Sequence, residues 1–440
     1  MKITGLLLAA VLPSAAAFGL DLETVRSLAL ANSRTLARYN LAVENALLDE
    51  KILTFDTLPS LSLGASASAN IWGFSQGSVS LEEGLSGGIN FGVTQRVYNG
   101  GKNALLKSIA RMTTGIARQE AAAEYFAVLD AADAAYYGAL ESGAVLESSE
   151  AALEAAVFAL SMAEIRLESG MIGYSDYLYA LAEKEAKETL WNQSRRDCTL
   201  AAAALKNLTG LAELSGCEAI DGEAWEGIIQ KLAGLSEESA AAFQESFRTT
   251  AAANNPALVK AALAGSRAEQ AVSLAKREYL PSLSVGVSGG IEYSPLNGAP
   301  LPSGRLSLNA AIPLDIWVTG AAVEKKEYAR TEAALEKQSA AASLNLEIQT
   351  AVLDLITRAM SVLSSRRADE YARRHYEQVL ERYRLSNASV AELSDAAALA
   401  GSNRTQYIKA WYGFLRDASR LRSLGCFSSD EDLRAAFLSW

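Results

Sequence analysis

Proline is scarce in this sequence. Only 8 of the 440 residues are proline, and none lies between Pro59 and Pro256 or after Pro313. An interior proline costs a helix about 3 kcal/mol, so both proline-free stretches can form long helices. The richness in alanine, leucine, glutamate and arginine also favours long packed helices over a mixed globular domain.

The residues that usually build catalytic and metal sites are also few. The sequence has one histidine, His375, and lacks the G-x-S-x-G, H-E-x-x-H and phosphate-loop motifs. Its three cysteines are irregularly spaced, which indicates neither a disulfide framework nor a zinc site and leaves their pairing state open. We therefore expect no enzyme activity, no metal and no cofactor. The cysteines are Cys198, Cys217 and Cys426.

Basic stripes and long apolar runs are missing as well. The formal net charge is -11 at pH 7, and no basic stripe is interleaved with aromatic residues, which argues against nucleic-acid binding. After residue 17, no uncharged apolar stretch reaches the roughly 18 residues of a membrane-spanning helix. If this protein crosses a membrane, β-strands must do it.

The first residues have the order of a secretory signal peptide. Lys2 precedes an apolar run from Leu6 to Leu12 and the small residues 15–17, so we expect a signal peptide at 1–17. A short buried helix is the alternative. No cysteine follows closely enough for lipid attachment, so we expect no lipid anchor.

One pattern occurs twice along the chain. The segment LPSLSLG at 58–64 recurs as LPSLSVG at 280–286, with a helical period before each copy and a longer one after it. We expect a first helix-strand-strand-helix repeat at 18–210, a linker or equatorial region at 211–248, a second repeat at 249–425 and a C-terminal tail at 426–440.

Strict alternation of apolar and polar residues marks two strands in each repeat. Leucine, alanine or valine lies on one face and serine, glycine or asparagine on the other, which suits a lipid-facing surface and a wet lumen. A soluble sandwich edge also alternates and is the alternative. Each strand is about as long as a tilted membrane-crossing strand. The expected strands are about 60–71, 85–97, 282–293 and 304–315.

Aromatic residues flank these strands, where a membrane aromatic girdle is expected. Four strands cannot close a barrel, so several chains must share one. Two chains would give a barrel filled by its own side chains, whereas three would give about twelve strands and a wider lumen. The aromatic residues are Phe55, Tyr98, Tyr279 and Trp317 near the helices and Trp72, Phe74 and Tyr293 at the far ends.

Helices account for most of the remaining sequence. In each repeat one long helix matches two shorter ones in summed length, and the long ones would extend about 100 Å at 1.5 Å per residue. Leu346, Leu353 and Met360 recur every seven residues, the period of a coiled-coil seam. The expected helices are 21–57, 102–168 and 172–209, then 249–279, 321–385 and 390–425.

Four motifs, together with the LPSLS segments at 58–62 and 280–284 where the first strand of each repeat begins, carry a family resemblance. TQRVYNGG at 94–101 is similar to Q-P-L-F-x-G-G, and NNPAL at 254–258 is similar to N-P-x-L. RLESGMIGYSDYL at 166–178 is similar to R-Y-x-x-G-x-x-S-x-x-D-V-L, and RYRLSNASVAELSDA at 382–396 is its second copy. Over essentially its whole mature length, the sequence resembles the TolC-like outer-membrane efflux proteins.

This resemblance implies a mainly α protein with membrane β-strands. The implied assembly is a homotrimer with a twelve-stranded barrel among outer-membrane lipids and a long coiled-coil helical barrel across the periplasm. It would dock a periplasmic adaptor protein and an inner-membrane transporter of the RND, ABC or MFS class, and export drugs, ions or secreted polypeptides. The alternative is a non-transporting coiled-coil protein of the envelope, structural or adhesive, which has no use for four alternating strands.

The resemblance also implies a periplasmic gate. The positions that match its acidic residues are Glu392 and Asp395, which in three copies would form two stacked carboxylate rings that attract cations. A solvated helix face is the alternative for this pair. Tyr383 and Asp176 match a tyrosine and an aspartate that latch the mouth. The matching arginine position is Ala388, so we expect a differently held gate, with Arg382 or Arg384 as substitutes by another route.

Two short segments match the places where the family meets its adaptor. A helical-hairpin turn needs small, flexible residues in any case, so a purely structural role is the alternative. The expected adaptor contacts are Ser169, Gly170, Met171, Ile172 and Gly173 in the first segment and Leu385, Ser386, Asn387, Ala388 and Ser389 in the second.

Overall fold

The computed structural model describes residues 20–438, except 71–72, 76–77, 81–83, 214–215, 221, 294–298, 386 and 428. The signal-peptide prediction at 1–17, Trp72 and Ser386 therefore lie outside the described residues. Within the described ranges, no helix has both the length and the apolar character needed to cross a membrane. The protein is mainly helical with four long antiparallel strands, which confirms the predicted fold class.

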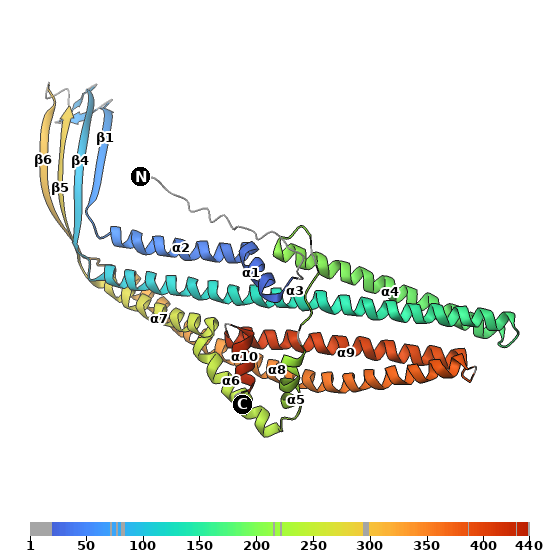
Figure 1. Cartoon of the computed structure of the whole chain (residues 1–440). Coiled ribbons are helices and arrows are strands. Elements are labelled where there is room, and N and C mark those ends of the chain that lie inside the picture. Colours follow the sequence, from blue (N-terminus) through green and yellow to red (C-terminus); the bar gives the residue numbers. More distant parts are fainter. Residues whose placement is uncertain are drawn as a thin grey trace. The chain divides into compact units, whose positions relative to one another are not determined.

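The four long strands form one antiparallel sheet in the order β1-β4-β5-β6 (Figure 1). The strand β6 starts and stops earlier than the predicted 304–315. It ends before Pro313, which has no N–H to donate to a ladder. A short hairpin of β2 (Gly73–Ser75) and β3 (Ser78–Ser80), which the sequence did not indicate, joins β1 to β4. The long strands are β1 (Ser60–Asn70), β4 (Gly84–Tyr98), β5 (Ser282–Tyr293) and β6 (Leu301–Ala311).

The strand register gives this sheet two chemically different faces. Successive residues along a strand point to opposite faces, so each row of paired residues lies on one face and the next row on the other. The apolar face is open to its surroundings in the single chain, since Leu61 is 73% and Leu306 77% exposed. One apolar row is Leu61, Val93, Val287 and Leu306, and the polar row beside it is Ser62, Gly92, Ser288 and Arg305.

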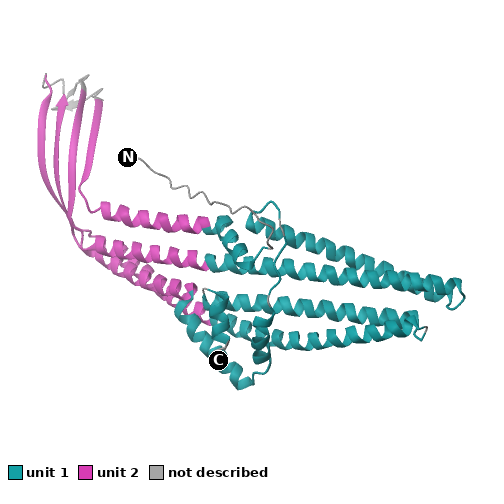
Figure 2. Ribbon diagram, in the orientation of Figure 1, with its two compact units in different colours: residues 1–36, 124–255, 344–440 teal, residues 37–123, 256–343 magenta. Residues whose placement is uncertain are grey.

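The chain divides into two compact units (Figure 2). The first consists of residues 1–36, 124–255 and 344–440, and the second of residues 37–123 and 256–343. The long helices α3 (Lys102–Glu168) and α8 (Ile316–Arg384) contribute residues to both.

The second unit contains the sheet, most of α2 (Arg34–Phe55), and α7 (Pro256–Lys276). The Thr114 hydroxyl on α3 donates to the Ala46 carbonyl on α2 at 3.3 Å. Where β4 returns into α3, Gly100 and Gly101 have φ angles of 66° and 71°, a region that favours glycine. Arg277 donates to the Gly100 carbonyl at 3.0 Å, and a side chain at Gly101 would require its guanidinium to shift. The glycine pair is therefore required by this turn.

The first unit contains the remaining helices. They are α1 (Leu22–Asn32), α4 (Tyr174–Thr209), α5 (Glu223–Ala233), α6 (Glu237–Asn254), α9 (Val390–Gly425) and α10 (Asp430–Leu438).

A buried ion-pair network links four helices of this unit. The Asp133 carboxylate on α3 is fully buried and lies 2.6 Å from Arg26 of α1 and 2.8 Å from Arg422 of α9. Asp430 of α10 lies 2.9 Å from Arg26. Burial alone lowers the pKa of Arg26, but its hydrogen bond to Asp133 and the charge of that carboxylate raise it above the ordinary value. The network links α1 and α10, the first and last described helices, to α3 and α9.

Two expected helices are interrupted in the structure. The helix predicted at 21–57 breaks at Ser33, whose hydroxyl oxygen accepts from the Leu36 N–H at 3.1 Å and caps α2. The helix predicted at 249–279 breaks at Asn255, because a residue before proline avoids the helical region and Pro256 starts α7. Residues 211–248 hold α5 and most of α6.

Candidate functional site

Two helical hairpins of the first unit end in short turns. The turn between α3 and α4 spans 169–173, and the turn between α8 and α9 spans 385–389. The most exposed apolar side chains in these turns are Met171 (70%) and Leu385 (71%). Ser389 caps α9, because its hydroxyl oxygen accepts from the Glu392 N–H at 3.1 Å. Both segments predicted as adaptor contacts coincide with these turns, and their role stays a prediction.

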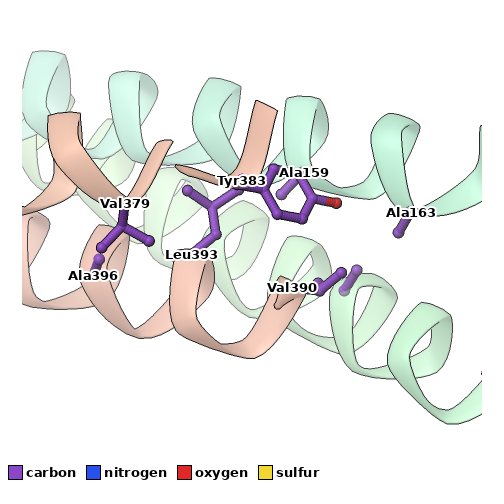
Figure 3. Packing of buried hydrophobic residues seen from close by; sticks show 8 residues of the cluster. Ala159, Ala163, Val379, Tyr383, Val390, Leu393 and Ala396 are labelled. Atoms are coloured by element: carbon purple, nitrogen blue, oxygen red, sulfur yellow. The ribbon is translucent and has the colours of Figure 1, made fainter. Parts of the chain in front are cut away.

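The two hairpins share one small hydrophobic core directly behind the turns (Figure 3). Half of its eight buried members are alanines, and the others are Val, Leu or Tyr. Ile172 and Ala388, from the two turns, pack against this core. Its buried members are Ala159 and Ala163 of α3, Ala180 of α4, Val379 and Tyr383 of α8, and Val390, Leu393 and Ala396 of α9.

Tyr383 of α8 is a buried member of this core (Figure 3). Its side chain has no exposed surface, and its hydroxyl has no hydrogen-bond partner among the described residues. The guanidinium of Arg166 lies 3.9 Å from the centre of its ring, and Arg166 also donates to its carbonyl oxygen. Burial raises the pKa of the Tyr383 hydroxyl, an effect that the Arg166 charge opposes.

Asp176 makes a local contact in the first turn of α4. Its carboxylate accepts from the Gly173 N–H at 3.3 Å and is exposed. Within one chain, no hydrogen bond joins it to Tyr383, whose hydroxyl is buried elsewhere. The predicted tyrosine-aspartate latch is therefore not formed in the single chain and stays a prediction for the assembled protein.

Glu392 and Asp395 lie one turn apart on α9, and both are exposed. Their partners differ. Arg382 lies 3.6 Å from the Glu392 carboxylate, whereas Asp395 accepts from the Tyr179 hydroxyl at 3.4 Å and has no cationic partner in the described part of the chain. Burial and the Asp395 charge raise the pKa of Tyr179. Only one carboxylate of the predicted rings thus has a counter-charge.

The two arginines considered as gate substitutes have separate partners. Besides pairing with Glu392, Arg382 donates to the Asn387 carbonyl at 3.1 Å and so ties α8 to the second turn. Arg384 pairs with Glu381 on its own helix at 2.8 Å. Arg166 was not recognised as a functional candidate from the sequence. The sequence marks Arg166 only by its place at the start of the motif at 166–178, and this place does not predict its contact with the Tyr383 ring.

The predicted aromatic girdle consists mainly of exposed side chains. Phe55 ends α2 and Trp317 lies in the first turn of α8, so these two flank the strands from helices. The side chain of Phe74 in β2 is not described. The girdle role stays a prediction. Exposed fractions are 63% for Phe55, 48% for Tyr98, 41% for Tyr279, 43% for Tyr293 and 73% for Trp317.

Comparison with known families covers both hairpin repeats. The sequence model of the outer membrane efflux proteins matches residues 25–211 and 248–425. The chain belongs to this family. No curated protein matches the sequence. Membership confirms the predicted resemblance and makes the protein an outer-membrane efflux channel component.

Solved structures of outer-membrane channels and proteins have a similar fold. The chain is similar to CusC, with a TM-score of 0.78, 15% identity, and coverage of 94% of this chain and 95% of the other. The CmeC channel of Campylobacter jejuni is similar with a TM-score of 0.78 and 16% identity, and the match covers 94% of this chain and 89% of CmeC. VceC of Vibrio cholerae is similar with a TM-score of 0.75 and 16% identity, and the match covers 92% of this chain and 96% of VceC. At these identities the similarity concerns the fold of this efflux protein and not its substrate.

Proposed function

We propose that three copies of this efflux protein form the exit duct of an export system. Each copy contributes its four-stranded sheet to a twelve-stranded barrel in the outer membrane, and its helices to a tunnel through the periplasm. Solutes pass through the duct from the periplasm or from an inner-membrane pump to the outside. The observation that carries this proposal is the two-faced sheet with its uncovered apolar rows.

The free edges of the sheet favour a shared barrel. β1 and β6 each pair with one strand, so each has one edge without a partner among the described strands. In lipid, such an edge leaves backbone groups unpaired at several kcal/mol each. Pairing of β6 with β1 of the next copy removes both edges. Three copies then supply twelve strands around the polar rows, which leaves a water-filled lumen.

The exposed turns favour docking of a periplasmic adaptor. Met171 and Leu385 place apolar side chains at the ends of the two hairpins, where a partner can cover them. The adaptor would connect the duct to an inner-membrane transporter of the RND, ABC or MFS class. Drugs, ions and secreted polypeptides are all compatible with this arrangement, and the transporter would select among them.

The proposal is tested with the purified mature chain in detergent and in planar bilayers. We expect a trimer by light scattering and discrete conductance steps after reconstitution. A monomer or dimer without conductance would contradict the proposal and favour the structural coiled-coil alternative. A sample boiled before reconstitution is the matched control. Boiling unfolds the barrel and should abolish the conductance, so conductance that persists would come from an aggregate or a contaminant.

A further inference from the structure

Charged residues are scarce in the four long strands, and they share one face of the sheet. They are Arg96 of β4, Glu292 of β5 and Arg305 of β6. The register pairs Arg96 with Ser284 and Arg305 with Ser288. Ser284, Ser288 and Glu292 are an even number of positions apart on β5, so they point to the same face, which is the polar one. The strands therefore direct all their charged side chains to the face proposed to line the lumen.

The three charges lie at separate levels along the sheet. Measured along β5, Arg96 is level with position 284, Arg305 is level with position 288, and Glu292 is four positions further on. Four residues of an antiparallel strand extend about 14 Å, so neighbouring levels are about 14 Å apart along the strand. Arg96 lies near the end of β4 that leads into α3. From the helical end of the sheet outwards, the charges are therefore positive, positive and negative.

Neither arginine has a counter-charge in the described part of the chain. Both side chains are exposed, and neither guanidinium forms an ion pair with a described residue. The neighbours of Arg305 on its face are small, with Ser288 opposite it and Ser303 and Ser307 beside it on β6. The polar face of β1, which would border β6 of the next copy, carries only serine, glycine and asparagine. Both guanidinium groups are thus free to meet a solute.

We propose that Arg96 and Arg305 make the lumen of the barrel a binding path for small oxyanions, that is, solutes with carboxylate or phosphate groups. This inference rests on the proposed duct function, since it names the class of solute that the barrel favours. Threefold symmetry places three copies of each arginine at one level, which gives two rings of guanidinium groups. A guanidinium binds a carboxylate or a phosphate through two parallel N–H donors. Fixed charges of one sign in a lumen with low-dielectric walls also concentrate counter-ions.

Currents through trimers in planar bilayers test this path, with citrate and inorganic phosphate as probes. Arg305→Gln removes one ring, so we expect the anion-to-cation permeability ratio to fall about fivefold and the block of current by either probe to weaken. Arg96→Gln acts in the same direction, whereas Glu292→Gln raises the ratio. The acidic residues proposed for the mouth act in the opposite sense on ions, so each variant is compared with the unmodified protein.

Arg305→Lys is the matched control, because it keeps the charge at the same position. It should keep the permeability ratio and lose part of the block, since lysine lacks the paired donors of a guanidinium. Loss of the ratio in Arg305→Lys as complete as in Arg305→Gln would show that the charge is not the cause and would overturn the inference.

Arg305→Ser separates selectivity from misfolding, because this row of the sheet already has serine at Ser62 and Ser288. We expect trimers by light scattering and the same fall in the ratio as for Arg305→Gln. Trimers of both variants with unchanged permeability and block overturn the inference. So does failure of both to form trimers, which would make Arg305 a structural residue. If the unmodified trimer does not conduct at all, the proposed duct function fails. If it conducts and the arginine variants match it, only the oxyanion path fails.

Discussion

Arg382 on α8 places its guanidinium 3.6 Å from the Glu392 carboxylate on α9, across the second hairpin turn. Both side chains are about half exposed, so the pair itself adds little stability. Its importance is electrostatic, because it gives one of the two carboxylates at the proposed mouth a counter-charge. Asp395, one helical turn further on, accepts a hydrogen bond from the Tyr179 hydroxyl and has no cationic partner in the described part of the chain.

The first prediction is that Asp395 contributes more to cation selectivity than Glu392. One unit charge changes the energy of an ion 4 Å away by about 1 kcal/mol in a water-like dielectric, so Asp395→Asn lowers the cation-to-anion permeability ratio about fivefold. Glu392→Gln lowers it less. Arg382→Gln raises it, since Glu392 is then uncompensated. Reversal potentials in a salt gradient measure all three, and equal effects of the two acidic substitutions would contradict the assignment.

The second prediction concerns the buried network around Asp133. Asp133→Ala removes the fully buried carboxylate between two buried guanidinium groups and leaves the partly exposed Asp430 as their remaining shared partner, which costs about 3 to 5 kcal/mol. Glu23→Ala is the matched control, because Glu23 also pairs with Arg26 but is 74% exposed, and its loss costs less than about 1 kcal/mol. Urea unfolding of the detergent-solubilised protein measures both. Similar midpoints for the two variants would show that the network is not a stability element.

Local sequence patterns predicted much of the fold. Contacts between residues far apart in the sequence could not be predicted in this way. The alternation over 60–71 predicted a strand, because one face of a single-layer sheet is apolar and the other is polar, and this difference is written into successive residues. The break at Ser33 was missed because a serine cap inside a helical period carries a weak signal. The partners of Arg166 and Asp133 are set by tertiary packing more than a hundred positions away, so neither residue differs locally from a surface charge on an alanine-rich helix.

The third prediction uses two glycines with opposite requirements. Gly100 has a φ of 66°, and a side chain there would meet Leu280 at 2.8 Å, so Gly100→Ala destabilises the protein by about 1 kcal/mol or more. Gly143 lies inside α3 with nothing within 4 Å of an added carbon. Gly143→Ala therefore stabilises the protein by about 0.5 to 1 kcal/mol. Thermal unfolding of the trimers measures the change in melting temperature for each variant. If both variants change it in the same direction, the assignment of the Gly100 turn is wrong.

The last prediction separates the two faces of the sheet with neighbouring residues of β1. Leu63 lies on the apolar face and is 78% exposed, and an arginine there costs about 2 to 4 kcal/mol near the middle of a bilayer. We expect Leu63→Arg to reduce the yield of trimers in the outer-membrane fraction strongly. Ser62→Arg places the same side chain one position away on the polar face, so it should assemble normally and shift selectivity towards anions. If Leu63→Arg assembles normally and Ser62→Arg does not, the lipid-facing and lumen-facing sides of the sheet are assigned the wrong way round. If both variants assemble normally, these strands do not contact lipid.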